Sequence, residues 1–173
     1  MKSIKFNYLI KNYKQDIYRF SFYMLKNKPD AEDITQEVLI KTWENIEKFE
    51  FSKAKSWIMK TTYNLCIDLI RKRKSADNFV YESEKDEDFE LPDNDYLNNP
   101  LVKMENESLK ERINEAIQNL PEKLKTIFVM YEINEMKYKE ISDLLNIPIN
   151  SVKVFLLRAR KKLQLELQSY ETK

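Results

Sequence analysis

Residues 138–162 read YKEISDLLNIPINSVKVFLLRARKK. Apolar residues recur every three to four positions on both sides of Asn146-Ile147-Pro148, which predicts a helix over residues 138–145, a short turn, and a second helix over residues 150–167. Two helices joined by so short a turn are typical of a helix-turn-helix. The apolar side chains expected to pack the two helices together are Ile141, Leu144, Leu145, Ile147, Val152 and Leu156.

The second helix of this motif is basic. Between Asn150 and Lys162 it carries five basic residues and no acid, and Asn150-Ser151 is expected to cap its start. A helix that reads DNA presents polar side chains at its first turn to base edges and cations further along to phosphates. The alternative is an ordinary helical hairpin with a solvated basic face. The candidate DNA-contacting residues are Asn150, Ser151, Lys153, Arg158, Arg160 and Lys161.

Helical spacing continues through the rest of the chain, so we expect an all-α fold. Asp30 is expected to be the N-cap of the second helix, and Pro121 to be the first residue of the fifth. Trp43 and Trp57 are expected in the core, whereas Asp33, Gln36, Glu37 and Ile40 fall on the outer side of the second helix. The helices predicted before the helix-turn-helix cover residues 6–26, 30–49, 53–74, 105–120 and 121–133.

The composition excludes several kinds of enzyme. The chain has no glycine and no histidine, so it has no Gly-rich phosphate loop and no imidazole for a nucleophile pair or a metal. Glu32, Asp33 and Glu37 lie within two helical turns, but a helical-bundle metal site usually adds Glu-x-x-His. We therefore expect a protein that is not an enzyme, with no catalytic residue, metal or cofactor.

The single cysteine, Cys66, forbids an intramolecular disulfide and is interpreted as a core residue in a reducing compartment. No apolar run approaches the length of a membrane span, and the first residues lack the apolar core of a secretory signal. These features together predict a cytoplasmic location.

Charge is segregated along the chain. The net charge is +7 over residues 1–74, −8 over residues 75–100 and +2 over residues 101–173, although the total is only +1. The acidic middle is low in apolar residues, as disordered linkers are. We therefore predict two small helical domains, residues 1–74 and 105–173, joined by a flexible acidic linker over residues 75–104.

The first domain resembles region 2 of the extracytoplasmic-function (ECF) sigma factors of bacterial RNA polymerase, and the second resembles region 4. The two motifs occur in the family's order, and the resemblance covers nearly the whole chain. The residues that carry the region 2 resemblance are Asp30-Ala31-Glu32-Asp33-Ile34-Thr35-Gln36-Glu37, Trp43, Ser56-Trp57-Ile58, Asn64, Asp68 and Arg71-Lys72-Arg73. Those for region 4 are Leu120-Pro121-Glu122, Tyr138-Lys139-Glu140-Ile141, Ser151-Val152-Lys153 and Arg158-Ala159-Arg160-Lys161-Lys162-Leu163.

The resemblance implies a transcription initiation factor that binds core RNA polymerase and promoter DNA and has no small-molecule substrate. It implies that the second helix docks on the β′ clamp helices through Asp30, Asp33, Gln36, Glu37 and Ile40. It implies that the loop over residues 49–54 and the third helix open the −10 element, with Asn64 in the family's base pocket. The −10 contacts are expected from Lys53, Lys55, Lys60, Asn64, Arg71, Lys72 and Arg73.

The candidate DNA-contacting residues of the basic helix would then read the −35 element. The apolar side of this domain would touch the β flap, and the acidic linker would run towards the RNA channel. The resemblance also implies an anti-sigma factor as a partner, because family members often have one.

Two departures from the family pattern limit what can be carried over. Val154 and Phe155 stand where many members have a small polar residue and an arginine, so the −35 sequence does not carry over, and Phe155 is interpreted as packing rather than touching a thymine methyl. Asn146 stands where glycine is common and is expected to adopt the left-handed conformation.

Two rival hypotheses come from other classes of protein. One is a stand-alone helix-turn-helix regulator whose N-terminal bundle dimerises. The other is a helical interaction protein without a DNA role.

Overall fold

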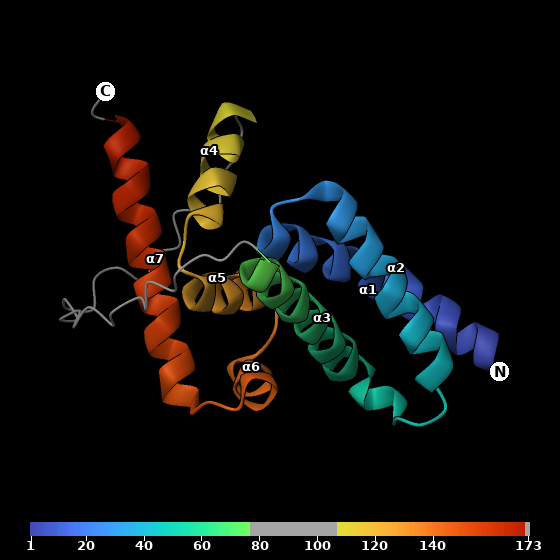
Figure 1. Ribbon diagram of the computed structural model, residues 1–173. Helices are drawn as coiled ribbons and strands as arrows, with labels where there is room; N and C mark the ends of the chain where they lie inside the picture. The colour runs from blue at the N-terminus through green and yellow to red at the C-terminus, as the bar shows by residue number, and fades with distance from the viewer. Residues whose placement is uncertain (77–106, 172–173) are drawn as a thin grey trace.

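The computed structural model describes residues 1–76 and 107–171, which are almost entirely helical and contain no strand (Figure 1). The expected all-α fold is confirmed. The first unit consists of α1 (Lys2–Leu25), α2 (Lys28–Asn45), a 3-10 turn (Phe51–Lys53) and α3 (Ala54–Ala76). The second consists of α4 (Glu107–Gln118), α5 (Glu122–Phe128), η2 (Val129–Ile133), α6 (Tyr138–Leu145) and α7 (Ile149–Glu171).

Helix α1 organises the first unit. Its residues Leu9, Ile17, Phe20 and Met24 recur at helical spacing, and each is at most 4% exposed. This stripe packs against α2 and α3. Each of those helices also has buried apolar residues at helical spacing, and these share one core with α1. From α2 and α3 the buried apolar residues include Ile34, Val38, Ile58, Met59 and Cys66.

The two tryptophans are less buried than expected. Trp43 is 39% exposed; it packs edge-on against Phe6 at 5.1 Å between ring centroids, and the Lys2 ammonium lies 4.6 Å from its ring. The prediction of a core Trp43 is therefore wrong, because the contacts from Phe6 and Lys2 of α1 leave more than a third of the residue exposed. Trp57 is partly buried and stacks on Phe49 at 4.9 Å.

The start of α2 differs from the predicted one. Asn27 is the N-cap: its side-chain oxygen accepts a hydrogen bond from the Asp30 N–H at 2.9 Å. The prediction of Asp30 as N-cap is wrong, because proline is accepted in the first helical turn and Pro29 therefore lies inside the helix. Asp30 lies in that first turn, where the helix dipole favours an acid.

The second unit forms around the predicted helix-turn-helix. Helix α6 covers the predicted residues 138–145, and Ile141, Val152 and Leu156 are at most 1% exposed. Leu144, Leu145 and Ile147 are partly buried against the same core, as expected of residues that hold α6 to α7. Helix α7 begins at Ile149, so Asn150 and Ser151 lie in its first turn and do not cap it as predicted.

The predicted helix over residues 121–133 is two elements. Pro121 precedes α5, which ends at Phe128, and residues Val129–Ile133 form a π-helical turn. In that turn the Asn134 N–H donates to the Val129 carbonyl at 2.9 Å, one residue further than in an α-helix. The apolar spacing of these residues fits both forms, so periodicity alone gave no sign of the change.

The two units pack against each other through α1 and α3. The Tyr23 hydroxyl donates to the Asn114 side-chain oxygen at 2.6 Å, and the Asn134 amide donates to the Asp16 backbone carbonyl at 3.0 Å. Figure 1 shows α5 pointing at the bundle formed by α1, α2 and α3. The predicted acidic linker lies outside the residues that the structure describes.

Among the described residues, three adopt positive φ: Lys26 (55°), Glu135 (54°) and Asn146 (55°). The left-handed conformation expected of Asn146 is confirmed, and it ends α6 with its N–H on the Ser142 carbonyl. Lys26 and Glu135 were not expected there. Without glycine the chain places two side chains with an ordinary Cβ in a region that costs an L-residue about 1–2 kcal/mol.

This conformational cost gives a stability prediction. Lys26→Gly and Glu135→Gly should each raise the free energy of unfolding by about 0.5–1 kcal/mol, because glycine relieves the clash but adds freedom to the unfolded chain. Asn146→Gly should change it by less than about 0.5 kcal/mol, because asparagine already tolerates this region. Urea denaturation followed by circular dichroism measures all three.

The matched control is Lys14→Gly on the exposed side of α1, which should lower stability by about 1 kcal/mol. If Lys26→Gly and Glu135→Gly destabilise the chain as much as this control does, the strain assigned to them is absent.

Candidate nucleic-acid interface

The turn between α6 and α7 fixes how the basic helix leaves the second unit. Asn146 reverses the chain, the Ser142 hydroxyl donates to the Ile147 carbonyl at 2.6 Å, and the Ile147 N–H returns a bond to the Ser142 carbonyl at 3.1 Å. The Pro148 carbonyl then accepts bonds from the N–H groups of Ser151 and Val152, which starts α7. Turn and helix are thus held by local bonds, and the first turn of α7 presents Asn150 and Lys153 to solvent.

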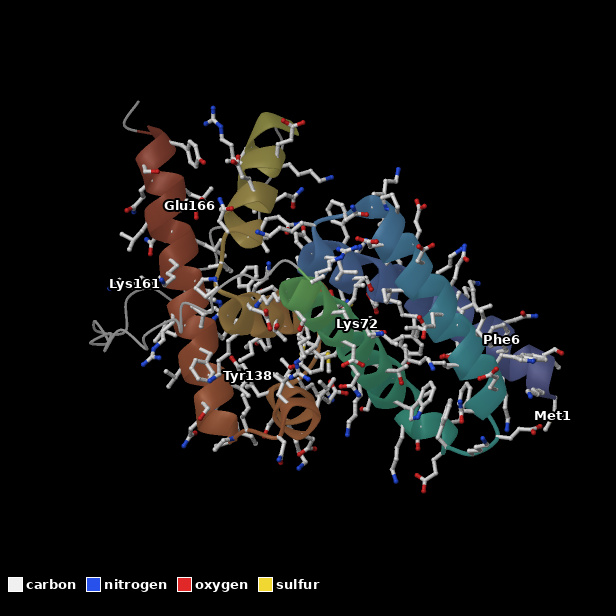
Figure 2. All side chains as sticks on the ribbon, in the orientation of Figure 1. Met1, Phe6, Lys72, Tyr138, Lys161 and Glu166 are labelled. Carbon is white, nitrogen blue, oxygen red and sulfur yellow. The ribbon has the colours of Figure 1, made fainter. Side chains whose placement is uncertain are left out.

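The cations along α7 have different surroundings. Lys153 is exposed, and its ammonium lies 5.6 Å from the centroid of the Tyr138 ring. Arg158 is partly buried beside Phe155, at 5.8 Å, and its buried Nε has no hydrogen-bond partner among the described atoms. Phe155 itself is partly buried against the core and also faces the Lys123 ammonium at 4.4 Å, in keeping with its interpretation as a packing residue. Lys161 is partly buried on α7, away from α3 (Figure 2).

Arg160 does not emerge into solvent as the sequence suggested. Its guanidinium donates through Nε, at 2.8 Å, and through Nη2 to Oε1 of Glu132 in the π-helical turn. The side chains of Arg160 and Glu132 are only 22% and 13% exposed. The structure therefore engages this arginine inside the second unit.

Three of the candidate −10 residues of the first unit lie on one side of α3. Lys60, Asn64 and Arg71 are all exposed, and spacings of four and seven residues bring them onto one face of the helix. Lys72 is also exposed and Lys53 is exposed in the 3-10 turn that precedes α3, where it pairs with Glu50 at 3.0 Å. This face carries cations together with one amide that can both donate and accept hydrogen bonds.

Two candidate −10 residues have partners elsewhere in the chain. The Lys55 ammonium reaches the backbone carbonyl of Glu135 at 3.5 Å, across the contact between the units. Arg73 pairs with Asp30 of α2 at 2.6 Å. Asp30, expected to bind core polymerase, is in this way tied to a residue expected to bind DNA, and the structure brings the two predicted surfaces into contact at this point.

The outer face of α2 is acidic and exposed. Asp33, Gln36, Glu37 and Ile40 lie at positions i, i+3, i+4 and i+7, and all four are exposed. Ile40 is 59% exposed, which leaves an apolar side chain in the middle of a polar helical face. This face therefore combines one exposed apolar side chain with two carboxylates and an amide.

Burial shifts the pKa of several groups. Burial raises the pKa of the Cys66 thiol to about 12, and the residue is fully buried as interpreted from the sequence. Burial, together with nearby Lys26, lowers the pKa of Lys125 to about 8, and its ammonium donates to the Gln118 carbonyl at 3.3 Å. Burial also raises the pKa of Asp16, although Lys55 and Arg19 oppose the shift.

Sequence reasoning missed the residues that support the basic helix. Tyr131 stacks on Tyr138 with 4.8 Å between ring centroids and an interplanar angle of 6°, and Glu132 holds Arg160. Both come from the π-helical turn, which the apolar spacing does not reveal. Sequence reasoning also missed the exposed aromatic pair Tyr8 and Phe51, whose ring centroids are 5.5 Å apart, because these residues are far apart in the sequence.

Within residues 1–76 and 107–171, no group of three or more acidic, cysteine or histidine residues could hold a metal ion. The helices described there are all too short or too polar to span a bilayer.

Comparison with known proteins agrees with the resemblance in the sequence. Residues 9–76 match the protein family Sigma-70 region 2, and residues 110–163 match Sigma-70, region 4. The chain is 33% identical over 167 residues to the ECF RNA polymerase sigma factor SigW of Bacillus subtilis, covering 90% of this chain and 85% of that protein. It is 30% identical over 156 residues to SigM of the same organism, covering 88% of each.

The fold also matches solved structures. The sigma factor RpoE in complex with the anti-sigma factor NepR, from Bartonella quintana, superposes with a TM-score of 0.71 at 21% identity, covering 97% of this chain and 98% of that one. The structure of CnrH in complex with the cytosolic domain of CnrY gives a TM-score of 0.67 at 17% identity, covering 95% and 88%. At these identities the likeness shows the fold.

Exposure along α7 gives a prediction for duplex DNA binding. Lys153→Gln should reduce the slope of log affinity against log salt by about 0.9, because one phosphate contact releases about that many counterions. The measurement is fluorescence anisotropy of a labelled duplex across a salt series.

The matched control is Lys139→Gln on α6, where the lysine is exposed and pairs with Asp143 at 3.7 Å. Its slope should stay unchanged. Equal slopes for the two variants would show that the first turn of α7 does not face the DNA backbone.

Proposed function

This chain belongs to the ECF RNA polymerase sigma factors of the sigma-70 family, and from that premise we propose what each of its surfaces does at a promoter. The protein binds core RNA polymerase, directs it to promoters and takes part in opening the DNA for initiation. One observation carries the assignment: separate basic surfaces, on α3 and on α7, lie in two units that match region 2 and region 4 in the family's order. It acts by binding and catalyses no step itself, and it works in the cytoplasm, where core polymerase is found.

The outer face of α2 binds core polymerase. Ile40 and the polar residues around it suit a partner helix of the β′ clamp, because an apolar centre with a polar rim is how helix surfaces usually associate. Asp33, Gln36 and Glu37 supply the rim. Asp30 contributes at the edge of this face, where it is shared with Arg73.

The exposed side of α3 binds and opens the −10 element. Asn64 receives an extruded base, for which an amide is suited because it can both donate to and accept from a base edge. Unstacking a base costs a few kcal/mol, which a fitted pocket offsets. Lys53, Lys60, Arg71 and Lys72 hold the phosphates around it, and Lys55 and Arg73 join them once their present partners are released.

The first turn of α7 reads the −35 element. Asn150, Ser151 and Lys153 reach the major groove, while Arg158 and Lys161 lie further along the helix towards the phosphates. Arg160, in its present pairing with Glu132, faces inward. The apolar side of the second unit contacts the β flap.

The two units have to separate at a promoter. Elements named −10 and −35 are about 25 base pairs apart, roughly 85 Å of duplex at 3.4 Å per base pair. A compact chain of this length has a radius of gyration of about 16 Å, which is too small to bridge that distance. The 30 residues between α3 and α4, residues 77–106, reach up to about 100 Å when extended.

An anti-sigma factor is a further proposed partner. RpoE was determined in complex with the anti-sigma factor NepR, and CnrH in complex with the cytosolic domain of CnrY, and both have a fold like this one. We further propose that the chain has two domains, residues 1–74 and 105–173, with the acidic linker between them.

The rival hypothesis of a stand-alone dimerising regulator is not favoured, because the N-terminal unit matches region 2 rather than a dimerisation domain.

Run-off transcription with core polymerase tests the function. We expect promoter-dependent product with this chain present, and Asn64→Ala should lose promoter opening while it still co-purifies with core polymerase. The matched control is Asn12→Ala, an exposed asparagine on α1 that should leave opening intact. Absence of both product and co-purification for the unaltered chain would refute the proposal, and loss of core binding by Asn64→Ala would refute the role of Asn64.

Separation of the units can be tested by linking them. Tyr23→Cys with Asn114→Cys places two thiols across the contact between the units, and a bis-maleimide with a reducible spacer joins them. Buried Cys66 should not react, because its pKa is about 12. The linked chain should give no run-off product, and reduction of the spacer should restore it.

The two single-cysteine chains, treated in the same way, control for modification alone. A linked chain that transcribes as well as the reduced one would show that the units need not separate.

A further inference from the structure

The π-helical turn Val129–Ile133 supports the promoter-reading helix. Val129 and Met130 are fully buried, and the backbone bond from the Met136 N–H to the Met130 carbonyl (2.9 Å) closes the turn. Single π-helical turns are rare and occur often at functional sites, because the extra residue re-aims the side chains that it carries. Here those side chains are Tyr131 and Glu132, and they contact α6 and α7 respectively.

Tyr131 joins the start of α6 to the middle of α7. One face of its ring stacks on Tyr138, the first residue of α6, and the Arg160 guanidinium lies 5.5 Å from the centroid of the same ring. Tyr138 in turn lies 5.6 Å from the Lys153 ammonium. Figure 2 shows Tyr138 where α6 meets α7. Tyr131 and Tyr138 therefore connect the inward-facing Arg160 with Lys153 at the DNA-facing end of the helix.

The Glu132–Arg160 pair differs from the other ion pairs of this unit. Both side chains are mostly buried, and two guanidinium nitrogens share one carboxylate oxygen. The pair Lys139–Asp143, by contrast, is 78% and 69% exposed. A two-donor pair shielded from water fixes geometry as well as charge, whereas an exposed lysine pair fixes little.

The position of Arg160 along α7 explains what the pair can control. Arg160 follows Lys153 by seven residues, two helical turns or about 10 Å along the axis. Holding the helix at both points fixes its tilt and its rotation about its own axis. If Arg160 turned to a DNA phosphate instead, the mostly buried carboxylate of Glu132 would lose both of its hydrogen bonds from the guanidinium, which is unfavourable.

We propose that Glu132, Arg160 and Tyr131 are positioning residues that set the orientation of α7 on promoter DNA, and that Arg160 does not contact a phosphate. The inference rests on the proposed reading of the −35 element by α7. Arg160 acts through Glu132 and the Tyr131–Tyr138 stack, so its substitution should disturb which sequence α7 selects more than how strongly the chain is attracted to DNA.

Arg160→Lys separates the two roles. It keeps the positive charge but loses the two-donor geometry, and lysine is not equivalent to arginine at such a site. The probe is a duplex enriched from DNA randomised over the −35 element by the unaltered chain with core polymerase, compared with a scrambled duplex. We expect Arg160→Lys to lose about tenfold in the ratio of affinities for the two duplexes. The salt slope of binding should stay unchanged.

A reciprocal exchange provides the rescue. Arg160→Glu alone and Glu132→Arg alone should lose discrimination, and the double variant Glu132→Arg with Arg160→Glu should recover it to within about threefold, with the unaltered salt slope. If Arg160 contacts a phosphate, the double variant stays weak and its salt slope falls by about 0.9. Thermal unfolding of each variant identifies any that is not folded, and Arg160→Lys then decides.

The outcomes also separate this inference from the proposed function. If the unaltered chain with core polymerase enriches no sequence, the assigned reading of the −35 element fails. If it does enrich a sequence and Arg160→Lys discriminates as well as the unaltered chain, the positioning role is overturned.

Discussion

The burial of α1 on two sides is the constraint on which the rest of the structure depends. One side of the helix receives α2 and α3, and residues such as Ile17 and Phe20 are completely removed from water there. Another side meets the second unit, through the Asp16 carbonyl and Tyr23. Because one helix serves both contacts, the two units form one packed body in this structure, and the faces of α3 and α7 proposed to bind DNA are fixed relative to each other until the units separate.

Much of this fold follows from the sequence, since helical spacing is a local property. The helix-turn-helix, the left-handed Asn146 and the exposed outer face of α2 were all predictable from residues close together in the chain. The errors arose where two local solutions compete. Asn27 and Asp30 are both good caps, and only the acceptance of Pro29 inside the helix decides between them. The spacing over residues 121–133 fits both an α-helix and a helix that changes to π-helical bonding at Val129.

The candidate site was less predictable than the fold. Sequence gives the position of a cation on a helix, but whether that cation is available depends on residues distant in the chain. Lys55, Arg73 and Arg160 are of the same chemical type as Lys60, Arg71 and Lys153, yet the first three meet Glu135, Asp30 and Glu132. Those partners are 80, 43 and 28 residues away in the sequence, respectively, and no periodic pattern links the members of each pair.

The contact between the units includes hydrogen bonds, so separating the units would expose polar groups to water. Tyr23, Asn114, Asn134 and the Glu135 carbonyl can all bond to solvent when their partners leave, so water can replace these hydrogen bonds when the units separate. A contact made only of leucine and phenylalanine would expose two hydrophobic surfaces when the units separate, and molecules in that state would aggregate. Here the polar groups would bind water on the separated surfaces, which suits the separation of the two units proposed above.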